Sequence, residues 1–559
     1  MKKVIFSFLF IISQLIFAQA PNWEWARKSV GNSFDDSIKT TCDNDGNVIS
    51  SGFFVSPTIT FGSFTLSNDD YRDGFITKYN STGDVLWAKK IGGIREQIVY
   101  SVCCDSQNNI YASGNFSSPT LTIENLTVSN SDFTNTTPQN DAFIAKFDSN
   151  GNIIWLKSGG GYGSDYGKSI SIDNQDNVFL GGVFSSESFF FDGLLTNNTG
   201  SINNSYHHDV FLIKINPNGD STWIKRFGGI NYDNLTCLAT DNIGNIYVAG
   251  YFMSQSFNAG IILTNTSSSF DFFIIKLNPL GQLIWAKKSI GTNNEVLSDI
   301  KIDNLNNIYV TGDFNSPIMT LGNISINKSI STNDNSSFNN NIFLAKYDVN
   351  GQIQWVKSAG GVTAFDGASG LDIDNSNNIY IVGRMYSDTV MFDSLPQLNN
   401  NGNADIFVTK YNPNGDAIWA KNTGSSSYDR ADSVSIFENS LYVNGVVSAL
   451  ATVNFDGTIF NQSSNQSGVF LAKLNLQNLN SNSFFEKKYS ISPNPVKNIV
   501  TIKSNGTPNS SYSLTDMNGR KLLSGKLSLE STDIDISHLQ KGIYIITYDQ
   551  KESLKLIKE

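Results

Sequence analysis

Hydrophobic and polar residues alternate in short runs along most of the chain, and turn-forming residues separate the runs. The segment DAFIAKFDSNGNIIWLK from Asp141 shows the pattern: two apolar runs flank Ser-Asn-Gly, which is typical of a hairpin turn. Counterparts of this segment begin at Asp73, Asp209, Asp271, Asn341 and Asp405. Period-two alternation around tight turns predicts antiparallel β-strands joined as hairpins.

A tryptophan followed two residues later by a basic residue marks each repeat. It occurs seven times, at intervals of 62 to 70 residues, at Trp25, Trp87, Trp155, Trp223, Trp285, Trp355 and Trp419. Seven copies in the same apolar context predict a structural role, in packing one repeat against the next, rather than stacking on a carbohydrate.

A second hairpin follows each tryptophan. Its first strand ends in an aspartate in six repeats, at Asp43, Asp105, Asp173, Asp241, Asp303 and Asp374. Its second strand reaches a glycine nine residues later, at Gly52, Gly114, Gly182, Gly250, Gly312 and Gly383. In the seventh repeat Phe437 stands near the aspartate position and Gly445 completes the pattern. The large differences in length fall after this glycine, between the two hairpins.

Four antiparallel strands per repeat are typical of a β-propeller blade. The seventh repeat ends at Asn475 without a tryptophan strand, whereas the strand around Trp25 has no partner in its own repeat. Pairing these two ends would remove a free sheet edge. We therefore predict an all-β fold in which residues 21–475 form a seven-bladed β-propeller closed by the Trp25 strand.

The repeat cycle of D-x-F-[ILV]-x-K, N-x-x-G, W-x-K, G-G, D-x-x-x-N-[IV]-[YF] and G-x-F resembles the bacterial family of seven-bladed β-propeller repeats. The resemblance covers residues 22–475. It implies the propeller fold, and it says little about activity because a propeller can carry many functions.

The first twenty residues have the order of a secretory signal peptide. Lys2 and Lys3 precede an apolar run from Val4 to Phe17, and small residues follow at Ala18 and Ala20. Because the run is short and is interrupted by Ser13 and Gln14, we expect cleavage and no transmembrane segment in the mature protein. The alternative is a membrane anchor.

After a polar linker at residues 476–488, the composition changes. Residues 489–559 alternate in short runs separated by Asn-Gly, Ser-Gly and Lys-Gly, which predicts a small Ig-like β-sandwich. This segment resembles the type A C-terminal sorting domain of the type IX secretion system of Bacteroidetes. The residues that carry the resemblance are Pro493, Asn494, Pro495, Asp516, Gly519, Arg520, Leu539, Gly542, Tyr544 and the run from Lys555 to Lys558.

That resemblance implies a partner and a destination. The partner is the type IX secretion machinery, and the destination, beyond periplasm and outer membrane, is the cell surface or the medium. The domain is lost when the protein is released or attached to surface lipopolysaccharide. The alternative is an adhesive module that stays on the mature protein.

Composition and charge agree with the repeat pattern and exclude two classes of partner. Charged residues are 16% of the chain, while Gly (45), Phe (38) and Tyr (21) are abundant, a mixture that suits strands and tight turns. The net charge is −11, and the acidic excess lies in residues 21–475. We expect no binding of nucleic acid or anionic membranes, because both need a basic surface.

Two groups of residues are candidates for binding a metal ion. His207 and His208 precede Asp209 but have no third ligand at suitable spacing, so a solvated loop pair is favoured over a metal site. Turns such as DNDGN from Asp43 resemble the start of a calcium loop without its later acidic ligand. We expect no cofactor and no metal; calcium stays open as the alternative.

Four cysteines occur, at Cys42, Cys103, Cys104 and Cys237. Cys42 and Cys104 take positions at which other repeats carry isoleucine, which favours unpaired thiols in an apolar slot over disulfides.

No catalytic residues are predicted. Variable segments on rigid hairpins favour a non-enzymatic binding or adhesion protein with a glycan or protein ligand. The first alternative is an extracellular hydrolase or lyase that acts on polysaccharides. The second is a structural component of the surface matrix.

Overall fold

A computed structural model of the protein describes residues 19–132, 139–200, 207–329, 339–362, 364–448, 452–461, 467–476, 489–504, 511–516, 520–528, 531–548 and 552–559. The predicted signal peptide and linker lie almost wholly outside these residues. The chain divides into two compact units, Met1–Gln477 and Asn478–Glu559, here called the repeat unit and the tail unit. The described residues contain strands and no helix, and none could therefore cross a membrane as a helix.

The repeat unit is built from seven antiparallel sheets, each with the order inner, second, third and outer strand. The inner strands are β2 (Asp35–Cys42), β8 (Gln97–Cys104), β14 (Asp165–Ile172), β20 (Asp233–Thr240), β26 (Glu295–Ile302), β32 (Gly367–Ile373) and β38 (Asp429–Phe437). The second strands are β3 (Val48–Phe54), β9 (Ile110–Phe116), β15 (Val178–Phe184), β21 (Ile246–Phe252), β27 (Ile308–Phe314), β33 (Ile379–Met385) and β39 (Ser440–Val447).

The third strands are β6 (Asp73–Tyr79), β12 (Asp141–Phe147), β18 (Asp209–Ile215), β24 (Asp271–Leu277), β30 (Asn341–Tyr347), β36 (Asp405–Tyr411) and β42 (Gly468–Asn475). The outer strands are β7 (Val85–Ile91), β13 (Ile153–Gly160), β19 (Ser221–Phe227), β25 (Leu283–Lys288), β31 (Ile353–Ala359), β37 (Ala417–Thr423) and, for the last sheet, β1 (Trp23–Lys28).

A small hairpin lies between the second and third strands of each sheet. These hairpins are β4 (Thr58–Phe61) with β5 (Phe64–Ser67), β10 (Thr120–Ile123) with β11 (Leu126–Ser129), β16 (Ser188–Phe191) with β17 (Leu194–Asn197), β22 (Ser256–Asn258) with β23 (Ile262–Thr264), β28 (Ile318–Leu321) with β29 (Ile324–Asn327), β34 (Thr389–Val390) with β35 (Leu398–Asn399), and β40 (Thr452–Phe455) with β41 (Thr458–Asn461). One of them, β16–β17, joins the outer strand β13 and extends the second sheet to six strands.

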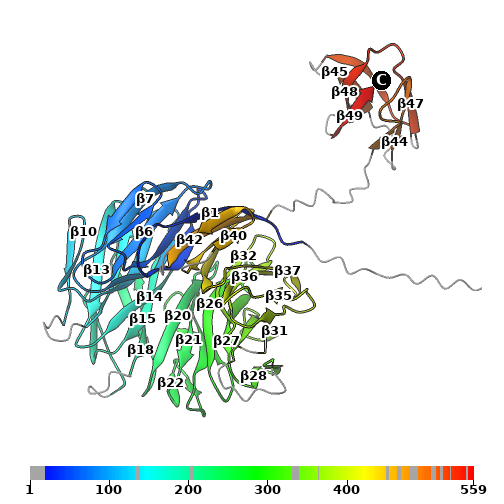
Figure 1. Ribbon diagram of the computed structural model, residues 1–559. Helices are drawn as coiled ribbons and strands as arrows, with labels where there is room; N and C mark the ends of the chain where they lie inside the picture. Colours follow the sequence, from blue (N-terminus) through cyan, green and yellow to red (C-terminus); the bar gives the residue numbers. More distant parts are fainter. Residues whose placement is uncertain are drawn as a thin grey trace, which may run out of the picture. The chain divides into compact units, whose positions relative to one another are not determined.

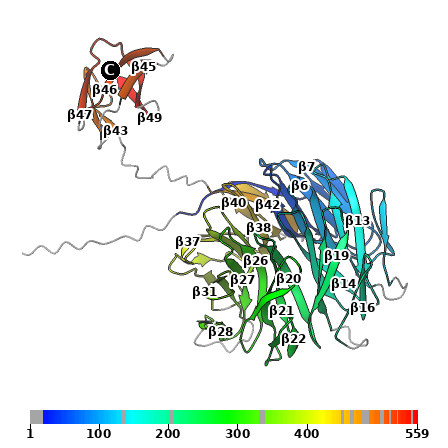
Figure 2. The same ribbon diagram turned by 180° about the vertical axis from the view of Figure 1, so that it is seen from behind.

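The seven sheets form a closed ring, in the manner of a β-propeller. The inner strands contact one another in the order β2, β8, β14, β20, β26, β32 and β38, and β38 contacts β2 again. The sheets fan out side by side from this centre (Figures 1 and 2). As the repeat pattern predicts, β1 pairs with β42, with Trp25 opposite Lys473, so residues far apart in the sequence complete one sheet. Each hydrophobic core lies between two neighbouring sheets; Ile49 and Ile76 of one sheet, for example, pack with Val99 and Phe143 of the next.

The repeated tryptophans lie at these contacts between sheets. Each of the first six packs its indole ring on the glycine of the next sheet's turn between third and outer strands. In four of them the indole Nε1 also donates to a turn carbonyl of that sheet, as Trp87 does to Ser149 at 3.3 Å. The turn glycines have positive φ, so a side chain would be strained and would collide with the ring; they are Gly83, Gly151, Gly219, Gly281, Gly351 and Gly415.

The seventh tryptophan has no such turn to contact, because the last sheet is completed by a separate strand. Trp419 is buried together with Trp23, whose Nε1 donates to the hydroxyl of Thr423 at 2.9 Å. At the closure, Trp23 therefore packs where each other sheet has the turn between its third and outer strands.

The tail unit contains two antiparallel sheets around one core. One has the order β43 (Tyr489–Ser492), β44 (Ile499–Ser504), β47 (Ser531–Asp535), and the other has the order β46 (Lys521–Lys526), β45 (Ser511–Asp516), β48 (Gly542–Tyr548), β49 (Glu552–Lys558). Val500 and Ile534 of the first sheet pack with Leu514 and Ile546 of the second. The more specific Ig-like arrangement stays a prediction.

Candidate functional site

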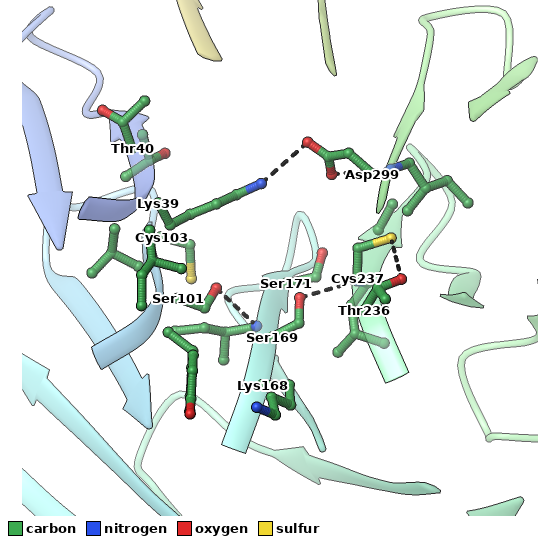
Figure 3. Close-up of a pocket in the computed structure, with 18 of the residues that line it drawn as sticks. Lys39, Thr40, Ser101, Cys103, Lys168, Ser169, Ser171, Thr236, Cys237 and Asp299 are labelled. Atoms are coloured by element: carbon green, nitrogen blue, oxygen red, sulfur yellow. Dashed lines mark hydrogen bonds and ion pairs between the residues drawn. The ribbon is translucent and has the colours of Figure 1, made fainter. Parts of the chain in front are cut away.

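A cavity of about 630 Å³ lies at the centre of the ring, and all seven inner strands line it. Its wall is mostly polar: serines and threonines alternate with four basic and several acidic side chains. Figure 3 shows some of these residues pointing into the space from different strands. We call this space the channel.

Every inner strand carries a β-bulge at the same position. The register with the second strand skips one residue, as between Ser37 and Lys39 of β2. A bulge re-aims the extra residue away from the regular alternation of the strand. The seven bulge residues differ in chemistry and all line the channel: Ile38, Tyr100, Lys168, Thr236, Ser298, Ser369 and Asp432. We call them the bulge ring.

The repeated glycine of the second strand exists because of this bulge. Opposite the bulge, a backbone carbonyl of the inner strand lies so close that a Cβ would collide with it; at Gly250 this is the carbonyl of Asn234. The same collision is present at the corresponding glycine of every sheet. The sequence pattern located these glycines, but the bulge itself was missed. A signal existed: in six repeats the bulge residue stands five positions before the turn aspartate.

In two inner strands, β8 and β14, the serine after the bulge connects to the next inner strand. The hydroxyl of Ser101 accepts a hydrogen bond from the backbone of Ile170 at 3.2 Å, and that of Ser169 accepts one from Leu238 at 3.1 Å. In β8 and β14, one side chain thus holds the ring together and the preceding one, at the bulge, faces the channel.

Most charges in the channel are paired. Lys39 and Asp299 meet across it at 3.2 Å (Figure 3), and Lys301 pairs with Asp372 at 3.1 Å. Arg430 contacts two carboxylates and lies 2.7 Å from Asp432. Burial raises the pKa of Asp432 to about 7 despite this contact.

Lys168 is different. Its Nζ lies 3.8 Å from the ring centre of Tyr100 and 4.8 Å from that of Tyr166, and it forms no ion pair with a described carboxylate. Burial lowers its pKa to about 8, so the amine is still mostly protonated at pH 7.

Aromatic and arginine side chains gather where the inner strands begin. Tyr232 lies 6.3 Å from Tyr251 and 6.0 Å from Phe270, and Tyr386 lies 5.7 Å from Tyr428. Guanidinium groups cover further rings: Arg72 over Phe53 and Tyr71, Arg384 over Phe365, and Arg430 over Tyr428. We call this set, with Phe34, the aromatic rim. It lies at the same end of the strands as the variable hairpins.

His208 belongs to this rim, which corrects the expectation of a solvated loop pair. Its ring is half-buried and lies 4.9 Å from that of Tyr232. Burial lowers its pKa to about 4, so it is neutral at pH 7. The sequence does not predict this burial, because the aromatic neighbour Tyr232 comes from the next sheet. The described residues contain no group of three His, Cys, Asp or Glu side chains able to hold a metal ion.

The turns that resemble calcium loops hold an ammonium group instead. Asp43 accepts hydrogen bonds from the backbone of Asp45 and Asn47, and its other oxygen lies 2.9 Å from Nζ of Lys78. Lys78 also donates to the carbonyl of Ser149 in the next sheet at 3.0 Å. Related lysine–aspartate contacts recur at Asp105, Asp241 and Asp374. The cation in these turns is therefore a side chain that links two sheets.

The four cysteines are free thiols. Cys237 is buried, whereas Cys42, Cys103 and Cys104 are half-buried, and all four line the channel. The predicted apolar slot is thus only partly closed. Burial raises the pKa of Cys42 to about 12, which keeps this thiol protonated.

The predicted sorting residues lie in the framework of the tail unit. Asn494, between Pro493 and Pro495, accepts a hydrogen bond from the backbone of Ile557 at 2.8 Å, so the two ends of the unit meet. Lys558 donates to the carbonyl of Lys497, and Tyr544 donates to that of Gln540 at 2.7 Å.

The remaining sorting residues occupy strand ends. Asp516 and Gly542 lie at the end of β45 and the start of β48. Gly519 and the Lys555 side chain lie outside the described residues.

Comparison with known proteins places the tail unit in a defined class. Residues 490–559 match the secretion system C-terminal sorting domain. The protein is therefore exported through the type IX secretion system to the cell surface or the extracellular space.

The chain is also similar to proteins that contain WD repeats. An uncharacterised WD repeat-containing protein of Acanthamoeba polyphaga mimivirus is 26% identical over 461 residues, 70% of this chain and 32% of that protein. The chain thus spans about a third of this relative.

Two solved structures illustrate the fold similarity. The Pan2 WD40 domain of Neurospora crassa is 9% identical with a TM-score of 0.37, and covers 81% of this chain and 98% of its own. PorZ, a surface component of the type IX secretion system of Porphyromonas gingivalis, is 10% identical with a TM-score of 0.25, at 94% and 81% coverage. These scores are too low to support a functional argument.

Proposed function

We propose that the repeat unit is a seven-bladed β-propeller that binds a glycan or protein at the cell surface or in the medium, without catalysing a reaction. The observation that carries the proposal is the bulge ring: one framework position, repeated in every inner strand, holds side chains of six residue types around one cavity. Positions that only maintain a fold are alike in each repeat, as the bulge glycines are. A varied set on a rigid framework suits recognition.

The aromatic rim supports the same proposal. Tyr71 and Phe34 are about half exposed, and the guanidinium group of Arg72 lies over the rings of Tyr71 and Phe53. Rigid aromatic surfaces beside polar groups are typical of binding sites for sugars and proteins.

The test is a glycan array together with capture of surface material from intact cells, both with the mature full chain. Tyr71→Ala should weaken binding at least fivefold. Leu280→Ala, an exposed residue in the turn between β24 and β25, is the matched control and should bind as the unchanged protein does. Blank results in both assays would favour a structural matrix component instead.

One observation favours a second candidate, a polysaccharide hydrolase or lyase. Asp432 lines the channel with a raised pKa, as a general acid requires. Release of reducing ends from a polysaccharide panel, abolished in Asp432→Asn, would establish it. No release would leave binding as the function.

A further inference from the structure

Lys168 is directed into the channel by the bulge in β14, between Gly167 and Ser169 in the register with β15. The hydroxyl of its neighbour Ser169 accepts a hydrogen bond from the backbone of β20. Ser169 therefore links two sheets, whereas Lys168 faces the channel. Figure 3 shows Lys168 in the wall of the space, away from the Lys39–Asp299 pair.

The charge of Lys168 has no carboxylate within 4 Å among the described residues. Each other basic side chain that lines the channel has a carboxylate within 4 Å: Lys39, Lys301 and Arg430. Lys168 instead lies over the faces of Tyr100 and Tyr166. Glu96, the carboxylate that acts on its charge from a greater distance, is paired with Arg72. A cation–π contact offsets part of the cost of burying an ammonium group, but a carboxylate would offset more.

The opposite part of the bulge ring offers hydroxyl groups. Ser298 and Ser369 line the channel and are half-buried, and their side-chain hydroxyls form no hydrogen bond with a described residue. The buried Ser37 hydroxyl, also in the lining, lacks a partner as well. Such groups can both donate to and accept from the hydroxyls of a sugar.

We propose that the channel binds an acidic sugar, a uronic acid residue, with its carboxylate on Nζ of Lys168 and its hydroxyls on the hydroxyl-bearing bulge residues of β26 and β32. The cavity of about 630 Å³ lies in the size range of small-ligand sites. This inference rests on the proposed binding function and names the chemical class of its ligand.

The experiment is calorimetric titration of the mature full chain at pH 7 with trigalacturonate and with its fully methyl-esterified form, which is neutral and of equal length. The unchanged protein should bind the acid at least tenfold more tightly than the ester. Lys168→Met should abolish this preference, and Lys168→Arg should retain most of it.

Lys225→Met, on the outer strand β19 and outside the channel lining, is the matched control and should keep the full preference. Melting temperatures separate binding from folding. Lys168→Met should not lower the melting temperature, because it removes a buried cation that has no carboxylate within 4 Å among the described residues. If Lys168→Met fails to fold, Lys168→Gln replaces it.

Three results would overturn the inference: equal affinity for acid and ester, no measurable binding of either, or an unchanged preference in Lys168→Met. If a glycan array at the same time gives neutral ligands that depend on Tyr71, the binding function stands and only the acidic class is wrong.

Discussion

At the scale of single residues, steric limits and buried charges explain why the same residue type recurs at a given position of each repeat. The bulge glycines face a carbonyl, and the turn glycines face an indole ring. Neither constraint is visible in the sequence, which shows that a glycine recurs but not what lies opposite it. The bulge residues do not stand out in the sequence, because they share no residue type that would mark their position in each repeat.

Gly250→Ala should destabilise the protein by about 3 kcal/mol, because the new methyl group would force β20 and β21 apart at the bulge. Gly468→Ala is the control, since the nearest atoms to its Cβ belong to the flexible Lys28 side chain at 3.2 Å or more. Denaturant unfolding measures both. Similar small losses in the two variants would show that the bulge tolerates a side chain.

Lys78→Met should cost about 3–5 kcal/mol, because it leaves the buried carboxylate of Asp43 without its cation. Replacing both residues, with Asp43→Asn added, should recover much of this loss. The double-variant cycle measures the coupling. Additive losses would mean that the ion pair contributes little to the contact between sheets.

At the scale of strands and sheets, alternation and turn residues predicted the two hairpins of each repeat, and the missing tryptophan strand predicted the pairing of β1 with β42. The junction of β13 with β16 and the burial of His208 were not predictable, because both depend on contacts with another sheet. The residue types of the inner strands can be read from the sequence. Which of these residues face the channel depends on the bulge, which is seen only in the structure.

The closing pair can be tested by a cross-link. Ala26 and Ala472 are opposite each other in β1 and β42, so cysteines at both positions should form a disulfide on mild oxidation and raise the melting temperature by several degrees. The pair Ala26→Cys and Val469→Cys is out of register and should stay reduced. Mass spectrometry distinguishes the two. A cross-link only in the second pair would contradict the register.

At the scale of the whole molecule, buried carboxyl groups recur at the junctions between sheets. Burial raises the pKa of Asp141 to about 6, of Asp233 to about 7 and of Glu295, beside Asp271, to about 8. A carboxyl group with a raised pKa in the folded state holds its proton where the unfolded chain has lost it. Stability should therefore fall as pH rises from about 5 to 8.

The fall in stability between pH 5 and 8 should be smaller in Glu295→Gln, since a glutamine side chain does not titrate. Asp84→Asn, at an exposed turn position, is the control and should leave the slope between pH 5 and 8 unchanged. Melting temperatures across this pH range test the expectation. A melting temperature that rises steadily from pH 5 to 8 would contradict it.

The pairing of β1 with β42 also sets an order of events in the life of the chain. The strand β1 can pair only after β42 has been synthesised, because the two are more than four hundred residues apart. Until Gly468–Asn475 has been made, the other six sheets can stack but the circle stays open with an exposed strand edge. The ring therefore closes only when the whole repeat unit is present. A copy truncated before β42 would keep an open ring with an exposed strand edge.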